Sequence, residues 1–493
     1  MNNFYANAAR HALLPLLAAL VLAGCATLPA SQVTAAGAPP ARFKEAGERW
    51  TVAQPAEAQA RGEWWRAFSD PVLDDLAARA SLSNTGIQQA ASRVAQARAL
   101  VRSVDADRSV QIGVGASATR QAGANTAGGA RPQTLTTAGA GLSWEPDLFG
   151  RLAKAGDAAR LDAQAREALL QSTRLLVQTE VAQTYLALRA ADAERALVRQ
   201  TVAAYEGSLQ LTERRYQAGD VAELDVARVR TELASTEAEA IALDRRRAEL
   251  EHALAVLVGE PASAFSLPVA DWTTLLPGIP AGLPSTVLAR RPDVSAAQSG
   301  ILAAQARLGV AQAAWFPDIS LTAQGGYASP EIGDLFKWSA RAWSVGALLS
   351  LPLFDGGRRQ SGVDSAAAQL DEALAGYRGQ VLGAFRDVED QLSALRLLRD
   401  QSQAQGRAVE AATRATVLSD SRYRNGFVSQ LDLLDARRSE LYNRRQALQV
   451  KAAQYYATVG LIRALGGGWD ATPGSGSNAS GVTHLAAAPQ AIH

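Results

Sequence analysis

The sequence predicts a mainly α-helical chain with a β-barrel part, in which long helical hairpins occur in tandem. Three observations predict this class: the chain repeats itself, two long stretches lack proline, and four short segments alternate apolar and polar residues. The chain has 493 residues and a net charge of +1, so it is long enough for two or more units. Its balanced charge gives no reason to expect nucleic acid as a partner.

An internal repeat runs through the chain at an offset of 207 residues. The segment 215–221 (RYQAGDV) recurs at 422–428 (RYRNGFV), and 224–226 (LDV) recurs at 431–433 (LDL). Upstream, AQAR at 95–98 recurs at 304–307, which is 209 residues away and predicts a small insertion. One offset kept across separate segments indicates a duplication. The expected division is a first repeat at 71–283 and a second at 284–465.

Each repeat is expected to contain a helix, two strands, a very long helix, a glycine turn and another long helix. No proline occurs between Pro146 and Pro261 or between Pro352 and Pro473, which permits long helices. The turns are expected near 216–225 and 423–432. From 149 to 216 a helix would extend ~100 Å. Residues spaced alternately by four and three along this helix predict a coiled-coil seam, which is interrupted at Arg189 and resumes at Ala193 and Ala196. Before the interruption the seam consists of Leu161, Ala165, Ala168, Ser172, Leu175, Thr179, Ala182 and Leu186.

Four segments predict membrane β-strands. They lie at about 110–119 and 135–145 in the first repeat and at about 318–327 and 342–353 in the second. Strict alternation over roughly ten residues is the signature of an outer-membrane barrel strand. Four strands cannot close a barrel, and an open edge in lipid leaves backbone groups unpaired. The chain is therefore expected to form an oligomer, and the residues alone leave two, three and four chains open.

The N-terminus predicts export and lipidation. An apolar run follows Arg10 and ends in Leu22-Ala23-Gly24-Cys25, which resembles a bacterial lipobox. We therefore expect a lipoprotein signal peptide at 1–24, lipidation of Cys25, and a lipid-anchored extended segment at 25–70. The alternative is a buried cysteine, although this is the only cysteine of the chain. Ala26 favours the outer membrane, and the tail 466–493 is predicted to be disordered.

The sequence predicts no enzyme, metal site or cofactor. It contains no zinc-ligand spacing, phosphate-binding glycine loop or nucleophile elbow. Two acids, Asp432 and Asp435, lie three residues apart and share one helical face. They are either an acid–base pair, a metal site, a ring of charge in an assembly, or two solvated carboxylates. In the last case the helix dipole stabilises each by ~0.3–1 kcal/mol.

The lipobox, the internal repeat, the four alternating segments and the long helices together resemble the TolC-like outer membrane factors of tripartite efflux pumps. The resemblance is strongest to the lipid-anchored OprM and NodT-type branch. The segments that carry the resemblance are Trp64-Trp65 with Asp70-Pro71, the stretch LARRPDV…FPDISLTAQGGY at 288–327, and LPLFDGG at 351–357. The likeness covers about 60–465. It implies a homotrimer with a shared 12-stranded barrel in the outer membrane and a helical tunnel across the periplasm. The implied partners are a periplasmic adaptor and an inner-membrane RND-type transporter.

The resemblance also implies roles at the two glycine turns. Residues matching Asp432 and Asp435 form acidic rings at the periplasmic constriction of such channels. Contacts between hairpins hold that gate shut, and here the expected participants are Asp225, Arg228, Tyr216 and Tyr423. Val428 departs from the pattern, because some members carry a latch arginine there. The expected adaptor contacts are Gly219, Ala222, Leu224, Gly426, Ser429 and Leu431.

The function implied is passive conduction of small toxic compounds to the exterior, with energy supplied by the inner-membrane pump. An alternative within the same class is a duct for type I protein secretion. A lipid-anchored coiled-coil adhesin would explain the helices but not the four alternating strands. A periplasmic lipoprotein enzyme is a further alternative, for which the sequence offers no assembled site.

Overall fold

The computed structural model describes residues 43–45, 63–122, 132–279 and 290–467. The chain divides into two units, Met1–Pro39 and Pro40–His493, and all of the described residues belong to the second. The predicted signal peptide, Cys25 and the tail from residue 468 onward lie outside the described residues. None of the helices in the described part is both long enough and apolar enough to cross a membrane.

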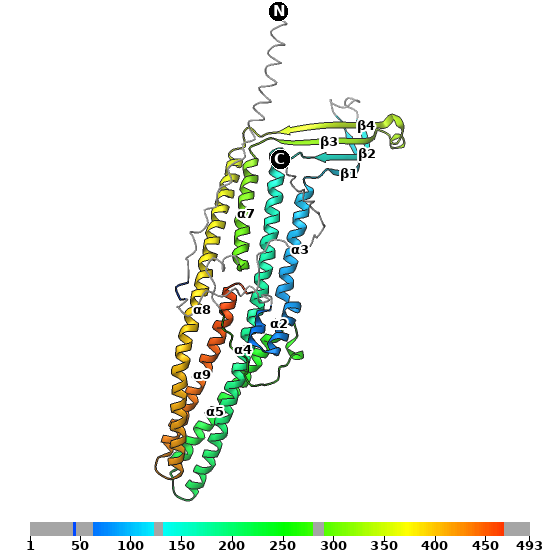
Figure 1. Cartoon of the computed structure of the whole chain (residues 1–493). Helices are drawn as coiled ribbons and strands as arrows, with labels where there is room; N and C mark the ends of the chain where they lie inside the picture. Colours follow the sequence, from blue (N-terminus) through cyan, green and yellow to red (C-terminus); the bar gives the residue numbers. More distant parts are fainter. Residues whose placement is uncertain (1–42, 46–62, 123–131, 280–289, 468–493) are drawn as a thin grey trace, which may run out of the picture. The chain divides into compact units, whose positions relative to one another are not determined.

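Two copies of one set of elements follow each other along the chain (Figure 1). The first copy comprises α3 (Thr85–Ala106), β1 (Gln111–Gln121), β2 (Gln133–Trp144), α4 (Arg151–Gln217) and α5 (Glu223–Leu257). The second comprises α7 (Pro292–Ala313), β3 (Asp318–Ser329), β4 (Arg341–Ser350), α8 (Arg358–Arg424) and α9 (Gln430–Ala464). Shorter elements complete the described chain: η2 (Trp64–Phe68), α2 (Pro71–Ser83), η3 (Ala262–Ala264), η4 (Ile332–Asp334) and η5 (Trp338–Ala340). This arrangement confirms the predicted fold class.

All three helices of the second copy begin and end 207 residues after their counterparts. This includes α3 and α7, so the shift to 209 residues that the AQAR match predicted is wrong. Packing follows the same offset, since Ile87 and Val94 of α3 are buried, as are Val294 and Ile301 of α7. The chance recurrence of small residues in two alanine-rich helices explains the misleading match.

The helices α4 and α8 contain 67 residues each, and both follow a strand closely. At 1.5 Å per residue each extends ~100 Å. Glycines in the left-handed conformation stand at both N-caps, Gly150 with a φ of 74° and Gly357 with a φ of 90°. The carboxylate of Asp147 then accepts hydrogen bonds from the first free N–H groups of α4, at 3.1 Å from Leu152 and 2.7 Å from Ala153. Each strand pair therefore leads directly into a helical hairpin, α4 with α5 or α8 with α9 (Figure 1).

The expected seam of α4 is buried in part. Ala168, Thr179, Ala182 and Leu186 are buried, and the other members of the first eight are half-buried. Beyond them Ala196 is exposed, so the seam does not resume there. Arg189, where the pattern falters, is only 2% exposed. A buried charge thus takes the place of an apolar seam residue.

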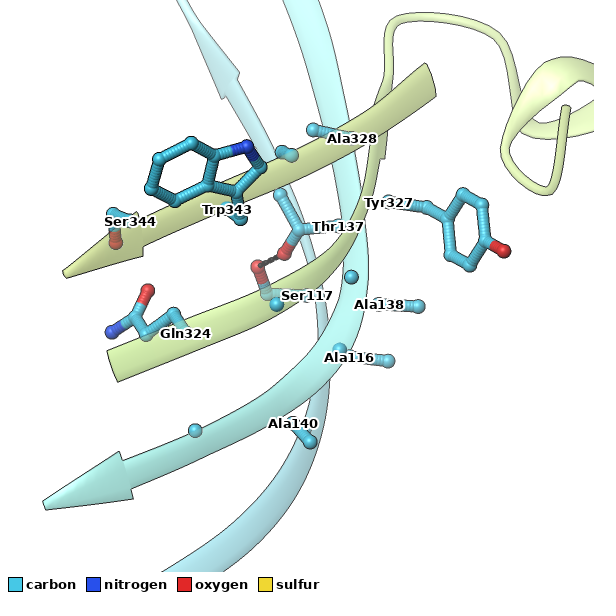
Figure 2. Close-up of a pocket in the computed structure, with 16 residues that line it drawn as sticks. Ala116, Ser117, Thr137, Ala138, Ala140, Gln324, Tyr327, Ala328, Trp343 and Ser344 are labelled. Atoms are coloured by element: carbon cyan, nitrogen blue, oxygen red, sulfur yellow. Dashed lines mark hydrogen bonds between the residues drawn. The ribbon is translucent and has the colours of Figure 1, made fainter. Parts of the chain in front are cut away.

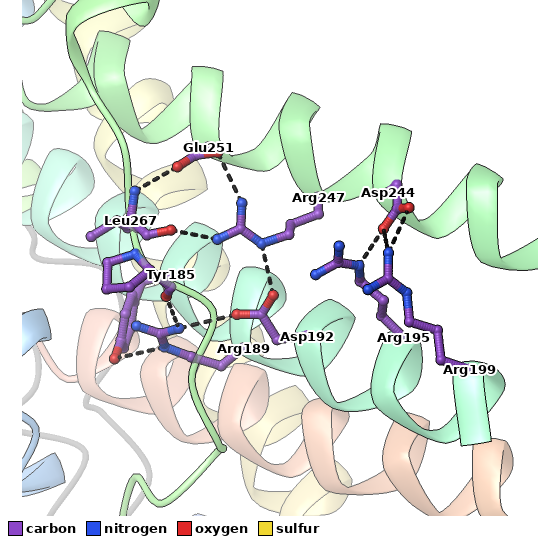
Figure 3. A network of polar contacts seen from close by, with 10 residues as sticks. Tyr185, Arg189, Asp192, Arg195, Arg199, Asp244, Arg247, Glu251 and Leu267 are labelled. Atoms are coloured by element: carbon purple, nitrogen blue, oxygen red, sulfur yellow. Dashed lines mark hydrogen bonds and ion pairs between the residues drawn. The ribbon is translucent and has the colours of Figure 1, made fainter.

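The Arg189 charge belongs to a network of polar contacts that holds the segment after α5 in place (Figure 3). We call this segment, residues 258–279, the linker. The Arg189 guanidinium donates to Asp192 at 3.0 Å and to the Pro268 carbonyl oxygen at 3.0 Å. From α5, Arg247 donates to Asp192 at 2.8 Å and to the carbonyl oxygen of Leu267 at 2.5 Å. Every buried charge here has an opposite charge or a carbonyl beside it, which offsets the cost of removing it from water.

The four strands form one antiparallel sheet in the order β1-β2-β3-β4. The pairing Ile112↔Leu142 continues across the sheet, as Leu142↔Ala323 and then Ala323↔Val345. Because side chains alternate along a strand, this register collects the apolar residues on one face. Among the described strands β1 and β4 are edges that pair on one side only. The face carries Ile112, Val114, Leu142, Leu321, Ala323, Trp343, Val345, Ala347 and Leu349.

The opposite face of the sheet is lined mainly by small or polar residues, with Leu135 and Leu348 as exceptions. Ser117 and Thr137 face each other across β1 and β2 with their hydroxyls 2.8 Å apart (Figure 2). Gly139 and Gly326 meet on adjacent strands, where a Cβ would collide with the neighbouring backbone. A hollow of about 470 Å³ is lined by these residues and their neighbours. The strand β4 ends at Ser350, short of the expected 353, because Pro352 has no N–H to donate.

Candidate functional site at the hairpin tips

Both hairpins reverse through the same type of turn. After α4, Gly219 has a φ of 82°, and its N–H donates to the Tyr216 carbonyl oxygen at 3.0 Å. The next N–H, of Asp220, donates to the Arg215 carbonyl oxygen at 2.8 Å. This pair of bonds is the Schellman motif, which needs a left-handed residue and therefore favours glycine. The turn after α8 repeats it, with Gly426 at a φ of 76°.

The helix α9 begins with a capping box formed by Ser429 and Asp432. The Ser429 N–H donates to the Asp432 carboxylate at 2.9 Å, and the Ser429 hydroxyl donates to it at 2.6 Å. In return the Asp432 N–H donates to the serine oxygen at 3.3 Å. The hydrogen bond from the Ser429 hydroxyl, followed by that from its N–H, lowers the pKa of Asp432. Asp432 is therefore a helix-capping carboxylate that stays ionised at the tip.

The other two tip acids are each paired within their own helix. Asp435 lies 3.3 Å from the Arg438 guanidinium, and Asp225 lies 3.6 Å from that of Arg228. Both arginines follow their acid by three residues, which places them on the same helical face. At the 207-residue offset Asp435 corresponds to Arg228, yet both tips place one acid beside an arginine of the same helix.

The two repeat-related tyrosines differ in their surroundings. Tyr216 is 45% exposed, whereas Tyr423 is 3% exposed. The Arg215 guanidinium lies 4.8 Å from the centre of the Tyr423 ring and donates to the Arg424 carbonyl oxygen at 3.4 Å. The Tyr423 hydroxyl has no hydrogen-bond partner within the part of the chain that the structure describes. Arg215 therefore joins the two tips inside one chain, a role the sequence did not reveal.

All six residues expected at the adaptor contact are exposed at the tips: Gly219, Ala222, Leu224, Gly426, Ser429 and Leu431. Phe427 is 75% exposed beside them and was not singled out from the sequence. Val428 is half-buried. Phe427 therefore joins Leu224 and Leu431 as a third large apolar side chain exposed at the tips.

Further along α9 from the tip, arginines of this helix also join the two hairpins. These arginines were not identified from the sequence. Arg438 pairs with Glu232 of α5, and the contact with this carboxylate raises the pKa of the guanidinium. One heptad on, Arg445 lies 3.1 Å from Glu239 of α5 and 2.8 Å from Glu194 of α4. We call the pairs Arg438–Glu232 and Arg445–Glu239 the arginine ladder. Its signal in the sequence is the double arginine at 437–438, which recurs seven residues later at 444–445.

Long hairpins that meet at their tips and begin at an apolar-faced sheet define a channel subunit that combines a membrane part with a helical duct. The sequence profile of the outer membrane efflux protein family matches residues 76–260 and 283–467. The two matched ranges are again 207 residues apart. The chain therefore belongs to the outer membrane efflux protein family.

Relatives and solved structures agree with this assignment. The chain is 33% identical to outer membrane protein OprJ of Pseudomonas aeruginosa over 467 residues, which cover 92% of this chain and 95% of that protein. It is 30% identical to the cation efflux system protein CusC of Escherichia coli over 93% of this chain and 98% of that protein. The structure of the outer-membrane channel OprN has a TM-score of 0.81 and 30% identity, and covers 88% of this chain and 97% of that one. The chain is thus an outer-membrane efflux protein.

Proposed function

We propose that this chain is the passive outer-membrane duct of a tripartite efflux system. The observation that carries the proposal is a sheet with one apolar face, four strands wide, that continues into two helical hairpins. Its strands contain 10–12 residues, which suits the ~9–11 needed to cross a bilayer. The rings of Phe149 and Phe316 are stacked with their centroids 4.9 Å apart. Both residues lie where strands meet helices, which is where the aromatic girdle of a membrane barrel is found.

The duct is proposed to be a homotrimer with a shared 12-stranded barrel. The edges β1 and β4 carry backbone groups that pair on one side only among the described strands. Lipid supplies no hydrogen bonds, so these edges must meet those of other copies. The family resemblance favours three copies. Lipidation of Cys25 would add an anchor in the outer membrane.

The cargo is proposed to be small toxic compounds delivered by an inner-membrane RND-type transporter and a periplasmic adaptor. Relatives named for antibiotic, toluene and cation efflux support this class of cargo. The adaptor would contact the exposed tip residues Gly219, Ala222, Leu224, Gly426, Ser429 and Leu431, together with Phe427. These side chains are exposed, and several are small or apolar, which suits a protein contact.

The tips are proposed to form the periplasmic gate. In a trimer Asp432 and Asp435 each occur three times around one axis, and six carboxylates at a narrow mouth attract cations. Asp225, Arg228, Tyr216 and Tyr423 remain the proposed latch to neighbouring hairpins. Since Asp225 and Arg228 already pair with each other, a neighbouring copy would have to share that pair.

Single-channel recording in planar bilayers tests the duct and the acidic gate together. We expect the wild-type protein to migrate as a heat-modifiable trimer and to form cation-selective channels. Replacing both Asp432 and Asp435 by alanine should reduce the cation selectivity several-fold, because most of the ring charge is removed. Channels with unchanged selectivity would refute the acidic ring, and the absence of any conductance from wild-type trimers would refute the duct.

A further inference from the structure

A short segment ahead of the first repeat is docked on the second. Phe43 is 2% exposed and packs among Val388 and Leu392 of α8 and Leu461 and Ala464 of α9. Its ring lies edge-on to Phe385, with centroids 6.3 Å apart and an interplanar angle of 66°. We call these five residues of α8 and α9 the socket. An aromatic side chain is thus inserted between the two helices of one hairpin.

The backbone after Phe43 is held by one carboxylate. Glu389 of α8 accepts the Lys44 N–H at 2.6 Å through one oxygen and the Glu45 N–H at 2.9 Å through the other. Charge-assisted bonds of this kind are stronger than neutral ones. Arg396, two helical turns further along α8, donates to the Glu45 carboxylate at 2.7 Å. The contacts therefore recognise an aromatic residue, two consecutive N–H groups and an acid.

The socket has a counterpart in the first repeat. At the 207-residue offset three of its five residues, Val388, Leu392 and Leu461, correspond to buried residues of α4 and α5, namely Val181, Tyr185 and Leu254. Arg396 corresponds to Arg189, which holds the Pro268 carbonyl oxygen of the linker. In the same linker the Leu267 N–H donates to Glu251 at 2.5 Å. Each hairpin thus has a segment bound across these residues: the linker, together with η2 and α2, on the first, and the Phe43 segment on the second.

We propose that the socket is a peptide-binding site whose occupant is the segment Phe43–Glu45 of the same chain. This docking completes the second hairpin as the linker completes the first. Residues before the first repeat are therefore a structural part of the second. The proposal rests on these contacts alone and stands whether or not the protein conducts.

Limited trypsin digestion of the full-length trimer in detergent tests the docking, because Lys44 is a trypsin site inside the held segment. Phe43→Ala and Glu389→Ala should each speed cleavage after Lys44 at least tenfold, since cleavage follows the population of the released segment. Glu372→Ala removes an exposed acid from the same helix and should leave the rate unchanged. Glu389→Gln keeps one accepting oxygen, so its cleavage rate should lie between those of the wild type and Glu389→Ala.

Hydrogen exchange shows whether the effect is confined to the second hairpin. In Phe43→Ala we expect exchange at 385–396 of α8 to accelerate at least tenfold, while the equivalent 178–189 of α4 stays at the wild-type rate. Wild-type cleavage and exchange in both alanine variants would overturn the proposal. Equal acceleration in both repeats would also overturn it, because it would show general loosening rather than release of the Phe43 segment.

Discussion

At the scale of single residues, Asp432 caps the N-terminus of its own helix, α9. Its carboxylate accepts both the N–H and the hydroxyl of Ser429. Asp435, one turn later, lies 3.3 Å from the Arg438 guanidinium, and its side chain is 60% exposed. The two acids therefore differ in role: the first caps the helix through neutral donors, and the second is paired with an arginine.

The capping box predicts a defined pH dependence. The pKa of Asp432 is lowered in the folded protein, so its stabilising contribution is fully present above pH ~4 and is lost as pH falls through the lower folded value. Ser429→Ala should speed amide exchange in the first turn of α9 roughly fivefold at pH 7, the size of a lost N-cap. It should also reduce the change in exchange between pH 5 and pH 2.5. An unchanged acid response would contradict the role of Ser429.

Tyr423 offers a second test at the residue scale. Its hydroxyl is buried and lacks a partner in the described residues, so within one chain Tyr423→Phe should stabilise the tip by ~1 kcal/mol. If the proposed latch is correct, the tips rearrange in the trimer so that this hydroxyl reaches a partner on a neighbouring hairpin. Tyr423→Phe should then raise the single-channel conductance several-fold. Wild-type conductance combined with higher thermal stability would show that the hydroxyl latches nothing.

At the scale of elements, the two hairpins of one chain are joined along α9, which contacts both α4 and α5, as well as at their tips. The arginine ladder repeats every seven residues, which keeps its pairs on one face of each helix. Arg437 adds a link from α9 to α8, with 3.0 Å to Asp420, and another to the Ser208 hydroxyl of α4. Val428 stands where some family members carry a latch arginine. In this chain the polar links between the hairpins are therefore made mainly by arginines of α9.

The ladder predicts how firmly the hairpins stay together. Arg438→Ala combined with Arg445→Ala should free α9 from α5 and raise the single-channel conductance several-fold, with ~1 kcal/mol or less lost per partly exposed pair. Arg444→Ala is the matched control, because Arg444 pairs with Glu440 of its own helix and donates to Thr413 of α8, within the same hairpin. If the control opens the channel as much as the double variant does, the ladder is not what holds the hairpins.

The same elements show how far sequence reasoning reaches. Alternation and the absence of proline depend on local backbone rules, so the fold class of long tandem hairpins with four strands was predictable. The buried Arg189, the ladder and the Phe43 socket depend on contacts between residues far apart in the chain. Arg189 illustrates the limit: a charge in a helical seam reads as an interruption unless Asp192 and the Pro268 carbonyl are known to meet it.

At the scale of the whole molecule, the register of the sheet separates a mainly apolar face from a face of mainly small and polar residues, on which Leu135 and Leu348 also lie. Val345 lies on the face that collects valine, leucine and tryptophan, and its neighbour Ser344 lies on the face of glycine, serine and threonine. In a closed barrel the first face would meet lipid and the second would line the channel. The smooth lining of small residues is consistent with a duct that passes varied cargo without a narrow selectivity site.

This separation gives a test in which two adjacent residues should respond oppositely. Val345→Arg places a charge in the lipid-facing surface near the middle of β4, where it should cost ~2–4 kcal/mol and reduce the yield of trimers folded into vesicles. Ser344→Arg carries the same charge into the water-filled interior, so trimers should form at near wild-type yield. Three added arginines in the lumen should instead lower the cation selectivity of the channel. Equal loss of folding in both variants would show that the two faces of this sheet do not meet lipid and water as proposed.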